Sequence, residues 1–142
     1  MKKVLLAGLV WLVGYTAPCY AAEPQILIHS TAYEATRVLT TDPTKALYWV
    51  TITWKTQANR WLIVYDSATV PVDGVLSGPL VMYCGVVSLA TDAAQGTRSF
   101  DFTSHPLPKT TNGTTVIIST NGAGCATKTA DGANNWLSAG IY

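Results

Sequence analysis

Apolar and polar residues alternate with a period of two along several short segments of the chain. In residues 48–54 one face would carry Tyr48, Val50, Ile52 and Trp54, which are mostly apolar. The other face would carry Trp49, Thr51 and Thr53. Such alternation, rich in aromatic and β-branched residues, predicts a β-strand. Residues 60–66 form a similar run after a five-residue connection, so we expect these two strands to pair as an antiparallel hairpin.

Turn-forming residues separate these segments at regular intervals. Asp73-Gly74, Gly78-Pro79 and Asn112-Gly113 favour turns, because glycine allows positive φ and proline fixes an extended neighbour. No segment after residue 21 keeps an apolar face at helical spacing over three turns. Eight or nine short strands are expected, within residues 26–29, 33–39, 48–54, 60–66, 80–89, 98–103, 114–120, 125–129 and 135–142. The sequence therefore predicts an all-β fold, a single antiparallel two-sheet β-sandwich that is jelly-roll-like or immunoglobulin-like.

The first 21 residues are typical of a secretory signal peptide. Lys2 and Lys3 precede an apolar run over residues 4–13, and Cys19-Tyr20-Ala21 offers small residues at the cleavage positions. We predict a leader over residues 1–21 and one domain over residues 22–142. A retained membrane anchor is the alternative, but the apolar run is shorter than the roughly 20 residues that a spanning helix needs. Lipidation at Cys19 is a second alternative, and Pro18 stands where a lipoprotein signal needs a small residue.

Charge and composition exclude several functional classes. The 142 residues include 9 Lys and Arg against 8 Asp and Glu, and the net charge is +1. Loss of Lys2 and Lys3 with the leader would lower it to −1. A phosphate-binding surface usually shows a basic excess, so nucleic acid is not an expected partner. With 49% hydrophobic and 12% charged residues, the chain is expected to form a packed core rather than a disordered segment.

Two cysteines remain after the leader. An even pair in an exported protein predicts a disulfide between Cys84 and Cys125. A redox or metal-binding pair is the alternative, but Cys-x-x-Cys spacing is absent and only His29 and His105 could assist.

No catalytic signature stands out in the sequence. Asp101, Ser104 and His105 lie close together along the chain, but proximity in sequence is not the geometry that a catalytic triad needs. The carboxylates are scattered singly, and no phosphate-binding loop, zinc motif or nucleophile elbow occurs. We predict a protein without enzymatic activity, cofactor or metal, in which no residue is catalytic and His29 binds no metal.

Tryptophan is the residue type that could support binding. We expect Trp54 and Trp61 to pack in the core. Trp49 would face away from Trp54, and Trp49 and Trp136 are the candidates for ligand or partner contact at the surface. These two side chains could stack against the rings of surface glycans.

Several short motifs resemble small virion proteins of tailed bacteriophages. The resemblance covers about residues 46–142 and is carried by Tyr65-Asp66 through Asp73-Gly74, Pro79-Leu80-Val81, Phe100-Asp101-Phe102, Ser119-Thr120 with Lys128-Thr129-Ala130, and the final segment 136–142. It implies a β-sandwich used as a decoration or building block of a virus particle. Those proteins usually lack a secretion signal, and Cys84 and Cys125 are not part of their pattern.

The expected function is that of a non-enzymatic, exported structural or assembly protein, of the virion type or a host-encoded relative. Its expected partners are copies of itself or other structural proteins, and its expected location is secreted, periplasmic or at the cell surface, including on a virion. The alternative is a secreted carbohydrate or cell-surface binding module that uses Trp49 or Trp136. Stable membrane insertion is not expected once the leader is removed.

Overall fold

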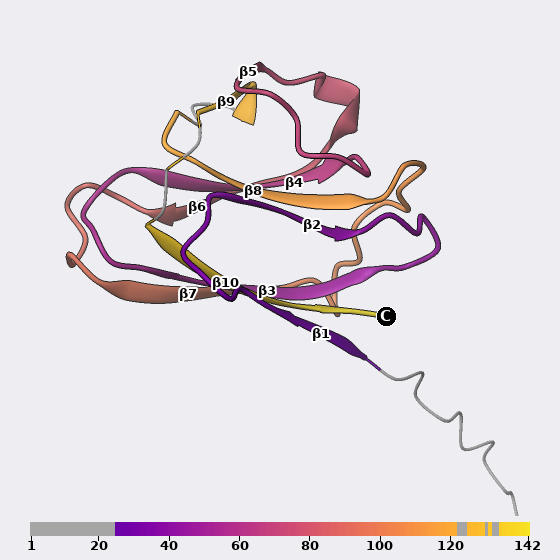
Figure 1. Ribbon diagram of the computed structural model, residues 1–142, viewed down its shortest axis with the longest axis horizontal. Coiled ribbons are helices and arrows are strands. Elements are labelled where there is room, and N and C mark those ends of the chain that lie inside the picture. The colour runs from indigo at the N-terminus through magenta and orange to yellow at the C-terminus, as the bar shows by residue number, and fades with distance from the viewer. Residues whose placement is uncertain (1–24, 122–124, 130, 132–133) are drawn as a thin grey trace, which may run out of the picture.

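The computed structural model describes residues 25–121, 125–129, 131 and 134–142, and in them two four-stranded antiparallel sheets pack face to face (Figure 1). Sheet A has the order β1 (Ile26–His29), β10 (Asn135–Ile141), β3 (Leu47–Trp54) and β7 (Gly96–Asp101). Sheet B has the order β2 (Thr36–Thr40), β8 (Thr114–Ser119), β4 (Arg60–Asp66) and β6 (Val81–Ser88). The predicted all-β, two-sheet sandwich is confirmed. The predicted leader, residues 1–21, lies outside the described residues.

The strands pair in a nested order. β1 pairs with β10, β2 with β8, β3 with β7 and β4 with β6, all antiparallel. The chain therefore behaves as one long hairpin that folds back between β4 and β6, and successive pairs lie alternately in sheet A and sheet B. This is jelly-roll topology, the first of the two arrangements that the sequence allowed. The described part of the chain contains no helix that is both long and apolar enough to cross a membrane.

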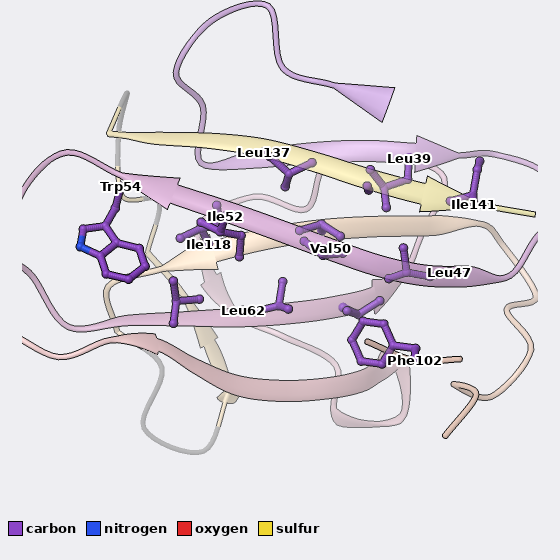
Figure 2. Packing of buried hydrophobic residues seen from close by; sticks show 14 residues of the cluster. Leu39, Leu47, Val50, Ile52, Trp54, Leu62, Phe102, Ile118, Leu137 and Ile141 are labelled. Atoms are coloured by element: carbon purple, nitrogen blue, oxygen red, sulfur yellow. The ribbon is translucent and has the colours of Figure 1, made fainter. Parts of the chain in front are cut away.

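The main core lies between the two sheets. Val50, Ile52 and Trp54 point inward from β3, as the alternation predicts. They meet Leu62 of β4 and Ile118 of β8 (Figure 2). Full burial of one such aliphatic side chain contributes roughly 1.5–3 kcal/mol, so this layer is the main stabilising contact of the domain.

A third layer covers the outer face of sheet B. It consists of residues 67–80 and 125–129, which we call the cover. The cover contains β5 (Gly74–Val75), β9 (Thr127–Lys128) and the short 3-10 helix η1 (Gly78–Leu80). Figure 1 shows β5 and β9 beside β4 and β8, on the side away from sheet A. A second apolar cluster fills the interface: Ile63, Tyr65 and Ile117 from sheet B with Leu76 and Cys125 from the cover. The central strands β4 and β8 of sheet B are therefore buried on both faces, and every residue of β8 is buried.

Covalent and ionic contacts hold the cover in place. The predicted disulfide between Cys84 of β6 and Cys125 is confirmed. Lys128, which is 5% exposed, donates a hydrogen bond of 2.6 Å to the Pro71 carbonyl and pairs with Asp73 at 3.0 Å. The amide of Leu76 donates to the Ala126 carbonyl. These contacts join the two halves of the cover to each other and to sheet B.

The predicted hairpin of residues 48–54 with residues 60–66 is wrong. β3 lies in sheet A between β10 and β7, whereas β4 lies in sheet B between β8 and β6. Residues 55–59 cross from one sheet to the other, and Arg60 at the start of β4 is fully buried. Its guanidinium donates to the carbonyl and the hydroxyl of Thr56 and forms an ion pair with Asp131. The crossing therefore closes around a buried arginine instead of forming a tight turn.

The first prediction concerns this buried ion pair. Arg60→Met leaves the Asp131 carboxylate buried without its cation, and we expect the free energy of unfolding to fall by about 3–5 kcal/mol. Denaturant-induced unfolding measures the loss. Arg98→Met is the matched control, since Arg98 is exposed on β7 and its removal is expected to cost about 1 kcal/mol or less. Equal losses in the two variants would contradict the structural role given to Arg60.

A second buried charge lies at the other end of β4. The Asp66 carboxylate accepts hydrogen bonds from the Thr111 amide at 2.9 Å, the Asn112 amide at 2.8 Å and the Thr111 hydroxyl at 2.8 Å. Burial raises the pKa of Asp66, but these bonds, with one from the Gly113 amide, outweigh burial and hold the pKa below its ordinary value. The ionised carboxylate thus organises the loop that leads into β8.

This lowered pKa predicts a pH dependence of stability. The unfolded chain binds a proton at Asp66 more readily than the folded chain, so the stabilisation is complete above the ordinary pKa of 3.8 and is lost as pH falls below it. We expect Asp66→Asn to be about 1–3 kcal/mol less stable than wild type at pH 6. The difference should shrink between pH 4 and pH 2 in denaturation curves. Asp92→Asn, which removes a carboxylate from the loop between β6 and β7, serves as control, and a difference for Asp66→Asn that is constant with pH would refute the assignment.

Candidate functional site

The outer face of sheet A is not covered by the described residues, in contrast to that of sheet B. Alternation along the strands places every second side chain of the sheet on this face. Its residues are Leu27 and His29 of β1, Trp136, Ser138 and Gly140 of β10, Trp49, Thr51 and Thr53 of β3, and Thr97, Ser99 and Asp101 of β7. Both tryptophans proposed for surface contact thus come together on one face of one sheet.

Trp49 lies in the middle of one row of this face. The register places it between Gly140 of β10 and Asp101 of β7. A methyl group at Gly140 would overlap both the Gln25 side-chain amide and the Trp49 indole nitrogen, so these two side chains share the space above this glycine. On the opposite side of Trp49, a shallow depression of about 400 Å³ is lined by Trp49, Thr51, Ser99, Phe100, Asp101 and Thr103.

Hydroxyl groups fill the centre of the face. Thr51 and Ser99 form a hydrogen bond of 2.7 Å across β3 and β7, and Thr53 and Thr97 form one of 2.9 Å. On the other half of the sheet the Nδ1 atom of His29 lies 2.9 Å from the Ser138 hydroxyl. Each hydroxyl is both a donor and an acceptor, so this centre is polar and uncharged.

Trp136 lies at the far end of the same face. It is 38% exposed and stands opposite Thr53 in the register. The ring of Tyr33 meets it edge to face at a centroid distance of 6.0 Å, and the Lys55 ammonium lies 4.0 Å above the Tyr33 ring. Trp49 and Trp136 are offset by four residue positions, which is about 13 Å along the strands.

The Asp101 carboxylate is the charged group in the depression beside Trp49. Its Oδ1 atom accepts hydrogen bonds from the Thr103 hydroxyl at 2.7 Å and the Thr103 amide at 2.8 Å. These two bonds hold the pKa of Asp101 below its ordinary value despite a small opposing effect of desolvation. Asp101 is therefore an ionised acceptor near neutral pH.

The residues considered for catalysis and metal binding have other contacts. Ser104 and His105 are exposed neighbours with 3.1 Å between the Ser104 hydroxyl and the His105 Nδ1 atom, and the Asp101 carboxylate contacts Thr103. His29 contacts Ser138, and within the described ranges no three His, Cys, Asp or Glu side chains gather as metal ligands would. The absence of enzymatic activity and of a cofactor stays a prediction.

Comparison of the chain with models of protein families, with curated proteins and with solved structures gives no match. The resemblance to phage virion proteins therefore stays a prediction from the sequence motifs.

Alternation along β3 predicts that Thr51 and Thr53 share the outer face with Trp49. The neighbours that Trp49 has on β7 and β10 depend on how the strands pair. Trp54 is 7% exposed and packs in the core, and Trp61 is half-buried against the second cluster. The sequence analysis missed Asp101 as a neighbour of Trp49 and Tyr33 as a neighbour of Trp136. The alternation of Phe100, Asp101 and Phe102 fits an outward-facing Asp101, but the pairing of β7 with β3 has no signal in a single sequence.

Proposed function

We propose that this protein is a non-enzymatic, exported structural or assembly protein, a decoration or building block of the virion type. It packs through sheet edges against copies of itself or against other structural proteins. The observation that carries the proposal is the apolar edge strand β1, whose Ile26 and Leu27 are 47% and 56% exposed. The motifs that resemble phage virion proteins support the virion type, and the predicted leader supports export.

The outer edge of β1 is suited to pairing with another strand. β1 is an edge strand of sheet A, and its four residues, Ile-Leu-Ile-His, include neither a lysine, a carboxylate nor a proline. Natural sheets usually protect their edges with such residues or with a covering segment, since an unprotected apolar edge recruits another chain. An added strand at β1 would extend sheet A and bury Leu27.

The other three edge strands, β2, β6 and β7, differ from one another in how they are protected. β2 carries Arg37, paired with Glu34 at 3.1 Å. β7 carries Arg98 and Asp101, and the Arg98 guanidinium donates to the Val86 carbonyl of β6 at 2.9 Å. β6, like β1, has no charged residue and no proline, and its Val86 is 39% exposed. The contrast with β1 is therefore clearest at the charged edges β2 and β7.

A second exposed apolar site lies on the cover. Val72 and Val75 are each 85% exposed, next to the β5–β9 pair. An assembly protein with two such sites could contact two neighbours, which is what a shell or fibre component requires. The β1 edge offers unpaired backbone groups beside its apolar side chains, whereas Val72 and Val75 contribute exposed side chains on the cover.

The third prediction tests this assembly role. Light scattering of the exported, oxidised protein over a wide concentration range should reveal a discrete oligomer or an open-ended fibre. Leu27→Lys places a charge on the β1 edge and should shift the protein to monomers by at least about tenfold in dissociation constant.

Thr97→Lys is the matched control, because it adds the same charge to β7, the opposite edge strand of sheet A. Its oligomeric state should equal that of wild type. A wild-type protein that stays monomeric at millimolar concentration, or an oligomer that both variants weaken equally, would refute assembly through β1.

A further inference from the structure

We propose that the outer face of sheet A binds a neutral oligosaccharide, with the Trp49 indole as stacking surface and Asp101 as acceptor of sugar hydroxyl hydrogens. This inference goes beyond the assembly role, because it concerns a sheet face with a different chemistry from the β1 edge.

The orientation of Trp49 is the first argument. Because the indole, together with the Gln25 amide, occupies the space above Gly140, its ring extends towards β10 instead of projecting straight out from β3. Gly140 itself is buried although it belongs to the outward-facing set. Trp49 is half-buried, so part of its indole stays accessible to solvent beside the depression. The electron-rich face of an indole attracts the C–H groups of a pyranose ring.

The polar groups beside Trp49 are the second argument. Thr103 occupies only the Oδ1 atom of Asp101, and no described residue donates to Oδ2. Oδ2 can therefore accept from a sugar hydroxyl, and a hydrogen bond to an ionised acceptor is stronger than one between neutral groups. The Thr51 and Ser99 hydroxyls line the same depression, whose volume of about 400 Å³ lies within the range of small-ligand sites.

The charge of the depression disfavours anionic oligosaccharides. Asp101 is the only charged residue among those that line the depression, so it repels phosphorylated, sulfated or carboxylated glycans. The row from Trp49 towards Trp136 continues through paired hydroxyls, which suit a polyhydroxyl chain better than an apolar protein surface. At the far end Trp136 can stack against a second ring of the same oligosaccharide.

The experiment is a binding screen of the exported, oxidised protein on an array of neutral hexose and N-acetylhexosamine oligosaccharides, with polygalacturonate and heparin as anionic controls. Titration with each positive oligosaccharide, followed by tryptophan fluorescence, then gives dissociation constants. We expect binding to neutral members only. Trp49→Ala and Asp101→Asn should each weaken it by about tenfold or more, whereas Trp49→Phe should retain part of the affinity.

Two further variants separate stacking from general damage to the fold. Gly140→Ala should also weaken binding, because its methyl group displaces the indole. Val72→Ala on the cover is the control and should bind as wild type does. Thermal unfolding of each variant verifies that it folds. Absence of binding to every neutral oligosaccharide at millimolar concentration, preference for the anionic polymers, or equal affinity in folded Trp49→Ala would overturn the proposal.

Discussion

The centre of sheet B, strands β4 and β8, is buried on both faces, and the arrangement of the domain follows from this constraint. On one face Leu62 and Ile118 meet sheet A, and on the other Ile63 and Ile117 meet the cover. A strand with two buried faces has apolar residues at consecutive positions. This explains why apolar and polar residues alternate less clearly in residues 60–66 and 114–119 than in residues 48–54. The Cys84–Cys125 disulfide fastens the cover to β6, and closing a loop of 41 residues stabilises the fold by about 4 kcal/mol in the chain-entropy model.

The two sheets consequently have different roles. Sheet B is the interior layer of the domain, whereas sheet A keeps one face towards solvent. On that free face the strands carry hydroxyl groups and two tryptophans where sheet B carries aliphatic side chains. The apolar edge of β1 belongs to the same sheet. Both proposed interactions, strand addition at the edge and sugar binding on the face, therefore depend on sheet A, and the cover leaves it accessible.

Local sequence patterns predicted most of the strands and the faces of β3. Alternation assigned Val50, Ile52 and Trp54 to the core and Trp49 to the surface, and the even number of cysteines after the predicted leader predicted the disulfide. The pairing of the strands was harder to predict, because the five-residue connection over residues 55–59 is compatible with either a hairpin or a crossing between sheets. The crossing is stabilised by the burial of Arg60 with Asp131, 71 positions later in the chain. Such a contact leaves no trace in local periodicity, and the same is true of Asp101 beside Trp49.

Hydrogen exchange of backbone amides, before and after removal of the disulfide, tests the layered arrangement most directly. In the oxidised protein β4 and β8 should exchange most slowly, because both of their faces are buried. In the double variant Cys84→Ser, Cys125→Ser the cover, residues 67–80 and 125–129, should lose most of its protection, while β3 and β10 keep theirs. Equal loss of protection in sheet A and the cover, or a cover whose protection is unchanged, would contradict the account.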